Sequence, residues 1–196
     1  MTDILVQDAQ ILNAREYEAM RAALSLNHRL LFDGCIFTGM RMSEFWSFIQ
    51  HLEWYHSERS FIAITSKKTE TRYKDRNVIL SNMGNRAIQD LVHGVRFNGI
   101  KPITRMGWQE DLKRAARKAG LENLHGIMPK MTRKTWVSWL VTTYPDDGLR
   151  IAASLGHDPR TMVEHYLSLP FSAEERAQIL PLVIGWGGRT NPPGRG

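Results

Sequence analysis

The stretch SLGHDPRTMVEHY, residues 154–166, says most about the fold that this sequence specifies. Its glycine ends one helical pattern, and a second helical pattern follows it. His157 comes directly after that glycine turn, and Tyr166 lies nine residues beyond the histidine. Alone, this spacing is a weak signal, because a histidine after a turn can cap a helix and a helical tyrosine can be half-buried.

Two further segments carry basic side chains next to predicted helix ends. In TGMRMSEF, residues 38–45, Arg41 follows a glycine that ends a helix, and in KMTRKTW, residues 130–136, Lys130 and Arg133 begin one. Opening a phosphodiester requires a nucleophile, neutralisation of the negatively charged transition state and a proton for the departing oxygen. Guanidinium groups stay charged and match phosphate oxygens at two points. Arg41 and Arg133 are therefore the candidates for charge neutralisation.

Taken in chain order, TGMRMSEF, KMTRKTW and SLGHDPRTMVEHY resemble the three boxes of the tyrosine recombinase (phage integrase) superfamily. These boxes are TGLRxSE, HxxR, and LGH followed by a nucleophilic tyrosine. The resemblance spans Thr38 to Tyr166 and includes the nine-residue step from histidine to tyrosine. It implies that Tyr166 attacks the scissile phosphorus and forms a 3′-phosphotyrosyl link, which conserves the bond energy so that no ATP is needed. It also implies that His157 donates a hydrogen bond to a non-bridging oxygen. No cofactor is expected, and the sequence has no carboxylate cluster or Cys/His spacing typical of a metal site.

Two lysine positions need separate consideration. The HxxR box has Lys130 in place of histidine, a feature similar to some archaeal plasmid and virus integrases, and a lysine can still bind phosphate as a point charge. The superfamily also uses a hairpin lysine to protonate the departing 5′-oxygen. Lys67 and Lys68 are both candidates, and neighbouring strand residues point to opposite faces. Lys68, followed by Thr69, matches the superfamily's Lys-Thr pattern better.

The rest of the sequence predicts a mainly α fold with a small antiparallel β-sheet or hairpin, in agreement with the catalytic-domain fold that the resemblance implies. β-branched and aromatic residues at 53–66 and 76–80 predict two or three short strands, with a charged hairpin tip between them. Capping residues are expected at Asn13, Ser81, Thr104 and Ser172. Helices are predicted at 14–25, 27–37, 42–52, 82–95, 105–119, 132–144, 147–156, 160–169 and from 172 onward.

The chain is predicted to form one catalytic domain over residues 1–184, followed by a disordered Gly/Pro-rich tail at 185–196. About 37 residues precede Thr38, so the N-terminal domain with which many members clamp DNA is not expected here. A fragment of a longer protein and a naturally minimal recombinase both stay open. With one cysteine, no secretory signal and no apolar run of about 20 residues, a cytoplasmic protein without a membrane span is expected.

The charge distribution favours a polyanionic partner, and the resemblance implies that this partner is double-stranded DNA, on which a homo-oligomer of two to four subunits is expected to assemble. The net charge is +6, and an excess of positive charge favours phosphate binding through counterion release. Three basic clusters fit a surface that follows a DNA backbone: Lys67, Lys68, Arg72, Lys74 and Arg76; Arg105, Lys113, Arg114, Arg117 and Lys118; and Lys130, Arg133 and Lys134.

Two other functions are compatible with parts of this pattern. A type IB topoisomerase shares the tyrosine and arginine chemistry but relaxes supercoils, and a catalytically silent protein could use the same fold only to bind DNA. The TGMRMSE and SLGH boxes favour a recombinase over the topoisomerase. The presence of Tyr166, His157 and both arginines argues against the silent protein.

Overall fold

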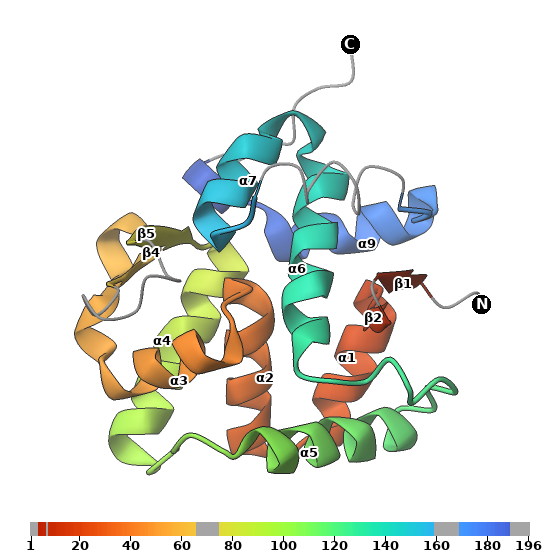
Figure 1. Cartoon of the computed structure of the whole chain (residues 1–196), viewed down its shortest axis with the longest axis horizontal. Helices are drawn as coiled ribbons and strands as arrows, with labels where there is room; N and C mark the ends of the chain where they lie inside the picture. Colours follow the sequence, from red (N-terminus) through yellow and green to blue (C-terminus); the bar gives the residue numbers. More distant parts are fainter. Residues whose placement is uncertain (1–3, 7, 66–74, 159–168, 189–196) are drawn as a thin grey trace.

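The structure is a computed structural model that describes residues 4–6, 8–65, 75–158 and 169–188. The predicted hairpin tip lies outside the described residues, and so does the predicted helix at 160–169 apart from its last residue. Lys67, Lys68 and Tyr166 therefore lie outside them too. Within the described part the predicted fold class is confirmed, because the chain is mainly helical with small antiparallel sheets (Figure 1).

The elements of the described part follow one another closely along the chain. The helices are α1 (Ala14–Ala23), α2 (Leu26–Thr38), α3 (Met42–Gln50), α4 (Asn82–Phe97), α5 (Arg105–Lys118), α6 (Lys130–Thr143), α7 (Gly148–Leu155) and α9 (Ala173–Val183). The strands are β1 (Ile4–Val6), β2 (Ala9–Ile11), β3 (Tyr55–His56), β4 (Phe61–Ile64) and β5 (Arg76–Ile79). Short 3-10 turns are η1 (Leu52–Trp54), η2 (Ser57–Arg59), η3 (Pro145–Asp147) and η4 (Trp186–Gly188).

Four helices begin at the capping residues that the sequence predicts. The side chains of Asn13, Ser81, Thr104 and Ser172 each accept a hydrogen bond from the backbone N–H three residues later. Each bond satisfies one of the donors that a helix start leaves without an intrahelical partner. α6 begins at Lys130, two residues earlier than predicted, so Lys130 and Arg133 both lie in its first turn.

α6 runs through the centre of the molecule and packs against α2, α7, α9 and β2 (Figure 1). Trp136, Trp139 and Leu140 on this helix are at most 1% exposed. Trp139 Nε1 donates to the carbonyl of Leu12 at 2.8 Å, and Thr135 Oγ1 accepts from the Leu12 N–H at 3.1 Å. A helix buried on nearly all faces belongs to the core. The side chains at its N-terminus therefore stand on a rigid support.

The sheets are small and antiparallel. β3, β4 and β5 form a three-stranded sheet in that order, within the two or three short antiparallel strands predicted, and Ile64 pairs with Arg76 at its outer end. The two-stranded β1–β2 sheet near the N-terminus was not predicted. It packs against α6, and the N–H of Gln10 donates to the carbonyl of Gly126 at 3.0 Å. The N-terminal residues therefore complete the core beside α6.

The packed part of the chain extends past the predicted domain end at residue 184. Trp186 is 0% exposed and its ring stacks on Tyr144 with centroids 5.9 Å apart. Its Nε1 donates to the carbonyl of Ile79 at 3.1 Å. The glycine-rich composition of this segment gave no signal for this one large apolar side chain, whose burial fixes η4 against the end of α6 and β5. Residues 189–196 lie outside the described part.

The described residues give two further findings, one on the single cysteine and one on membrane-spanning helices. Cys35 is buried, and this burial raises the pKa of its thiol, as expected for a structural cysteine. Over the described ranges, every helix is too short or too polar to cross a lipid bilayer.

Gly39 is the glycine on which the first box depends, and its replacement should be costly. Its φ is +57°, and a Cβ there would lie 2.7 Å from both Leu155 Cδ2 and Trp136 Cδ1. We expect Gly39→Ala to lower the free energy of unfolding by about 2 to 4 kcal/mol, from left-handed strain and overpacking together. Denaturant unfolding measures this loss.

Gly120 provides the matched control for that measurement. It also has a positive φ, +76°, but no atom lies within 4 Å of where its Cβ would be. Gly120→Ala should therefore cost only the backbone strain, about 1 kcal/mol. Equal losses in the two variants would contradict the packing that we describe around Gly39.

Candidate active site

Arg41 lies at the start of α3, just after the left-handed turn at Gly39 that ends α2. Its backbone N–H donates to Glu44 Oε2 at 2.8 Å, and its Nη1 donates to Glu44 Oε1 at 3.1 Å. The side chain of Arg41 is 39% exposed, whereas that of Glu44 is 5% exposed. Glu44 thus fixes both the main chain and the side chain of Arg41 while Arg41 stays open to solvent.

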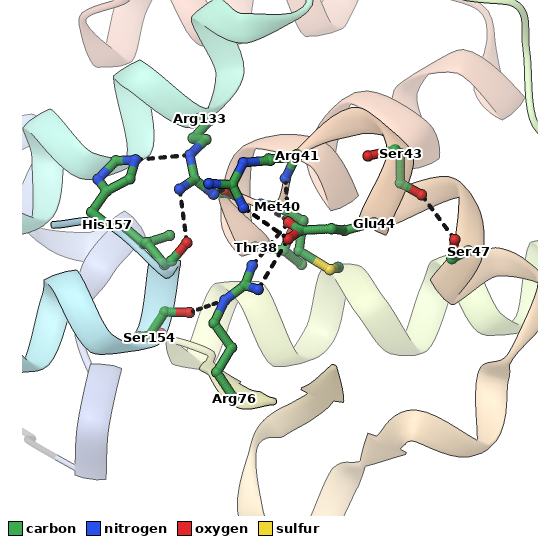
Figure 2. A network of polar contacts seen from close by, with 12 residues as sticks. Thr38, Met40, Arg41, Ser43, Glu44, Ser47, Arg76, Arg133, Ser154 and His157 are labelled. Carbon is green, nitrogen blue, oxygen red and sulfur yellow. Dashed lines mark hydrogen bonds and ion pairs between the residues drawn. The ribbon is translucent and has the colours of Figure 1, made fainter. Parts of the chain in front are cut away.

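A second arginine, Arg76 at the start of β5, binds the same carboxylate. Its Nη1 and Nη2 donate to Glu44 Oε1 and Oε2 at 3.0 and 2.8 Å (Figure 2). Burial alone would raise the pKa of Glu44, but the hydrogen bonds and charges of Arg76 and Arg41 outweigh it and hold the pKa below its usual value. Glu44 is therefore an ionised carboxylate whose two oxygens are both occupied.

Arg133 reaches from α6 to the ends of two other helices. Its Nη1 donates to the carbonyl of Gly39 at 2.8 Å, and its Nη2 donates to the carbonyl of Leu155 at 2.7 Å. Its Nε donates to His157 Nε2 at 3.0 Å (Figure 2). Arg133 is 8% exposed. These contacts lock the guanidinium plane between the C-terminal ends of α2 and α7.

His157 follows the left-handed Gly156 that ends α7, and its N–H donates to the carbonyl of Ala152 at 2.9 Å. Burial, and then the positive charges of Arg133, Lys134 and other cations nearby, lower the pKa of His157 to about 3. The ring is therefore neutral at physiological pH. Because Nε2 accepts from Arg133, Nδ1 carries the proton, and this buried Nδ1 has no hydrogen-bond partner in the described part of the chain.

One open pocket of about 590 Å³ brings the first two boxes together. Its lining residues are Met40, Arg41, Met42, Ser43, Trp46, Ile103, Thr104, Arg105, Pro129, Lys130 and Arg133. Lys130 is exposed at the first residue of α6. Of the six predicted site residues, Arg41, Lys130 and Arg133 line this pocket, and His157 joins it through Arg133. Lys68 and Tyr166 are not among the described residues.

Among the described residues, those that line the pocket include four basic side chains, Arg41, Arg105, Lys130 and Arg133, and no acidic one. Burial, together with the charges of Lys130 and Arg133, lowers the pKa of Lys134 to about 8. Burial is the larger cause of this shift, and repulsion from the two neighbouring cations adds to it. A bound phosphate would relieve that repulsion, so the site is suited to an anion. The described residues contain no group of three or more His, Cys, Asp or Glu side chains placed to hold a metal ion.

Two arginines of this region were not predicted as site residues, because the sequence pattern places both in basic clusters expected on the surface. Arg105 lines the pocket from the start of α5. Arg76 does not lie on a DNA-facing surface, since its side chain is 7% exposed and ion-paired. Its burial follows from its place on β5: side chains two apart in a strand share a face, and Val78, two residues later, is 0% exposed.

The low pKa of His157 predicts how stability depends on pH. An ordinary histidine gains its proton near pH 6.5, whereas this buried ring stays neutral down to about pH 3. Between those values the unfolded chain binds a proton that the folded protein does not. The stabilisation is therefore complete above about pH 6.5 and is lost as the pH falls toward 3, by up to about 1.4 kcal/mol per pH unit.

Thermal melts of the wild type and of His157→Gln test this expectation. Glutamine can still accept a hydrogen bond from Arg133 but does not titrate. Below about pH 6.5 the Tm of the wild type should therefore fall more steeply than that of the variant. Parallel curves would contradict a neutral, buried His157.

The chain is similar to known proteins both in sequence and in fold. The sequence model described as "Phage integrase family" matches residues 7–172 of this chain. No curated protein sequence matches the chain.

Three solved structures are similar in fold. An XerA recombinase has 16% sequence identity and a TM-score of 0.62, covering 87% of this chain and 62% of its own. An XerH site-specific recombinase bound to difH substrate before cleavage has 20% identity and a TM-score of 0.61, covering 85% and 52%. XerH with a palindromic difH substrate after cleavage has 20% identity and a TM-score of 0.57, covering 78% and 48%. At these identities the likeness confirms the predicted recombinase catalytic-domain fold, and the chain spans about half to three-fifths of those proteins.

Proposed function

The chain belongs to the phage integrase family, and from this membership we propose that it is a site-specific DNA recombinase. It cleaves and rejoins DNA through a 3′-phosphotyrosyl intermediate at Tyr166, without ATP or a metal ion. The proposed catalytic domain runs from the N-terminus of this sequence to at least Gly188, where the described packing ends.

One observation carries this proposal: two arginines from distant segments face one pocket in fixed positions. Arg41 is held there by Glu44, and Arg133 is held by two backbone carbonyls and His157. Donors that are already in place lose little energy to reorganisation when charge develops on a reacting group. Two guanidinium groups in one pocket therefore suit the non-bridging oxygens of a phosphodiester in its transition state.

The proposed reaction needs one nucleophile and one leaving group. The Tyr166 hydroxyl releases its proton to solvent and attacks the scissile phosphorus, the bond to the 5′-oxygen breaks, and that oxygen takes a proton from the donor, so that one proton leaves and one is gained. Lys68 is the proposed proton donor, and Lys67 is the alternative. Lys130 supplies positive charge beside Arg41 and Arg133, in agreement with its exposed place on the pocket wall. His157 acts as a neutral hydrogen-bond donor.

The proposed partner is double-stranded DNA, on which the protein works as a homo-oligomer of two to four subunits. The structurally similar XerH is described as bound to its difH substrate, which supports a DNA partner for this fold. The positive pocket and the net charge of +6 support the same partner. Exchange between two duplexes requires a nucleophile at each cleaved strand, so at least two subunits must act together.

A covalent trapping experiment with duplexes of randomised sequence tests the function. The full chain is incubated with a pool of such duplexes, each nicked so that the short fragment bearing the 5′-hydroxyl diffuses away after cleavage. Covalent adducts should form equally well in excess chelator, because arginines supply the charge that a metal would otherwise provide. Sequencing the adducts gives the preferred duplex, and mass spectrometry should find the DNA link on Tyr166.

Each other outcome of this experiment has a definite meaning. If no member of the pool gives an adduct, the protein does not cleave DNA and the proposal is wrong. Adducts that rejoin a resupplied copy of the lost 5′-hydroxyl fragment but transfer to no second duplex would identify a type IB topoisomerase. Adducts that require magnesium would contradict the proposed mechanism.

A further inference from the structure

Arg76 connects three parts of the candidate active site that are far apart in the sequence. It opens β5, it binds Glu44 on α3, and its Nε donates to the carbonyl of Ser154 on α7 at 3.1 Å (Figure 2). The contacts of Arg76 therefore reach the first box, the third box and the strand that follows the segment 66–74.

Arg76 contacts the first box through two parallel hydrogen bonds to Glu44, which fix the relative orientation of the two side chains. Both terminal nitrogens of Arg76 donate to the two oxygens of Glu44, and the same oxygens accept from the backbone and side chain of Arg41. The side chains of Arg76 and Glu44 are 7% and 5% exposed, so water screens the pair weakly. A displacement of Arg76 would shift the carboxylate and, with it, the Arg41 guanidinium that faces the pocket.

The contact with the third box is equally close. A Cβ on Gly156 would lie 3.2 Å from both Cδ and Nε of Arg76, so the arginine packs directly on this glycine. His157 directly follows Gly156, and Leu155 directly precedes it. The carbonyl of Leu155 accepts a hydrogen bond from Arg133. Arg76 thus supports the turn from which His157 and one anchor of Arg133 project.

Arg76 also fixes one end of the hairpin. Ile64 on β4 pairs with Arg76 on β5, and this is the outermost pair of the described sheet. The chain between these two strands contains Lys67 and Lys68. The arginine that holds Glu44 and Ser154 therefore also belongs to the strand pair that precedes and follows the lysine-bearing segment in the sequence.

We propose that Arg76 is a positioning residue for DNA cleavage, holding Arg41, the His157 turn and the base of the lysine-bearing hairpin in one arrangement. This inference rests on the recombinase function proposed above. Arg76 acts through Glu44 and Ser154 and not by contacting DNA, since its Nε, Nη1 and Nη2 all bind protein oxygens in a buried setting.

The test uses Arg76→Lys, which keeps the charge but cannot bind both Glu44 oxygens and the Ser154 carbonyl in one plane. Single-turnover cleavage of the duplex obtained by trapping is measured over a range of protein concentrations. We expect the rate at saturating protein to fall by about 10-fold to 100-fold, the scale of a small misplacement of reacting groups. The protein concentration that gives half-maximal cleavage should change by less than about 2-fold, because no phosphate contact is lost.

Arg21→Lys is the matched control for a purely structural ion pair. Arg21 Nε binds both oxygens of the 5% exposed Asp33 at 3.0 and 2.9 Å, and neither residue lines the pocket. Arg21→Lys should lower the Tm but leave the saturating cleavage rate unchanged when both are assayed well below their melting temperatures. If Arg76→Lys cleaves like the wild type at saturation, Arg76 is only structural and the inference is wrong.

A double variant tests whether Arg76 works through the carboxylate. Glu44→Gln alone should slow cleavage, and adding Arg76→Lys to it should slow cleavage by much less than Arg76→Lys does in the wild type. Fully multiplicative effects would contradict the route through Glu44. A wild type that forms no adduct defeats the proposed function itself, whereas a cleaving wild type with an equally active Arg76→Lys defeats only this inference.

Discussion

Tyr166→Phe should abolish the covalent protein–DNA adduct completely while changing the affinity for DNA by less than about 2-fold. The substitution removes one hydroxyl, which is the proposed nucleophile, and the described residues that line the pocket include no tyrosine that could form the 3′-phosphotyrosyl link instead. DNA affinity depends mainly on phosphate contacts, to which a single uncharged hydroxyl adds little. Denaturing gels with the trapped nicked duplex measure the adduct, and a mobility shift measures binding.

Tyr144→Phe is the control for loss of a tyrosine hydroxyl. Tyr144 is buried, and its hydroxyl donates to the carbonyl of Val183 at 3.3 Å, at the far end of α6 from the pocket. This variant should form adducts at the wild-type rate. An adduct that persists in Tyr166→Phe would remove Tyr166 from its proposed role, whatever the control does.

Arg133→Ala should slow cleavage by about 10²-fold or more, the scale seen when one preorganised transition-state donor is removed. The loss has two sources, because Arg133 supplies charge to the pocket and also holds the ends of α2 and α7 together. Arg133→Lys should recover part of the rate, since it restores the charge but not the planar set of donors. Single-turnover cleavage, corrected for the folded fraction from thermal melts, gives the comparison.

Arg29→Ala is the control for losing an arginine that supports the backbone but supplies no charge to the pocket. Arg29 also donates to two backbone carbonyls, those of Leu24 at 2.8 Å and Ala22 at 2.9 Å, but it does not line the pocket. Its loss should affect the Tm and not the cleavage rate. If Arg133→Ala cleaves within a few-fold of the wild type, the pocket is not the site of charge neutralisation.

Local rules were sufficient for most of the fold. The capping residues Asn13, Ser81, Thr104 and Ser172 signalled helix starts because each needs only atoms three residues away. Two features of the fold were not predicted, because contacts between residues far apart in the sequence determine them. The three-residue strands β1 and β2 are too short for an alternating pattern and depend on packing against α6. Trp186 is buried because its ring stacks on Tyr144, which lies far away in the sequence, so the residues next to Trp186 give no signal of its burial.

In the candidate site, too, features set by nearby residues could be predicted and features set by distant contacts could not. Three motifs indicated Arg41, Lys130, Arg133 and His157, and the structure places these residues together. Spacing could not indicate that Arg133 would bind His157 or that Arg76 would be buried against Glu44, because each pair joins elements set side by side by the whole fold. The assignments of Lys68 and Tyr166 stay predictions.

The place of Arg133 on α6 has a consequence for motion. Native proteins open locally at their edges, and segments surrounded by core are exposed only when the whole domain unfolds. Residues of α6 from Met131 to Val141 are almost all buried, so their amides should exchange with solvent only through global unfolding. Arg41 stands between two helices, where smaller openings can reach it. We therefore expect the backbone that carries Arg133 to stay in place during openings that move Arg41.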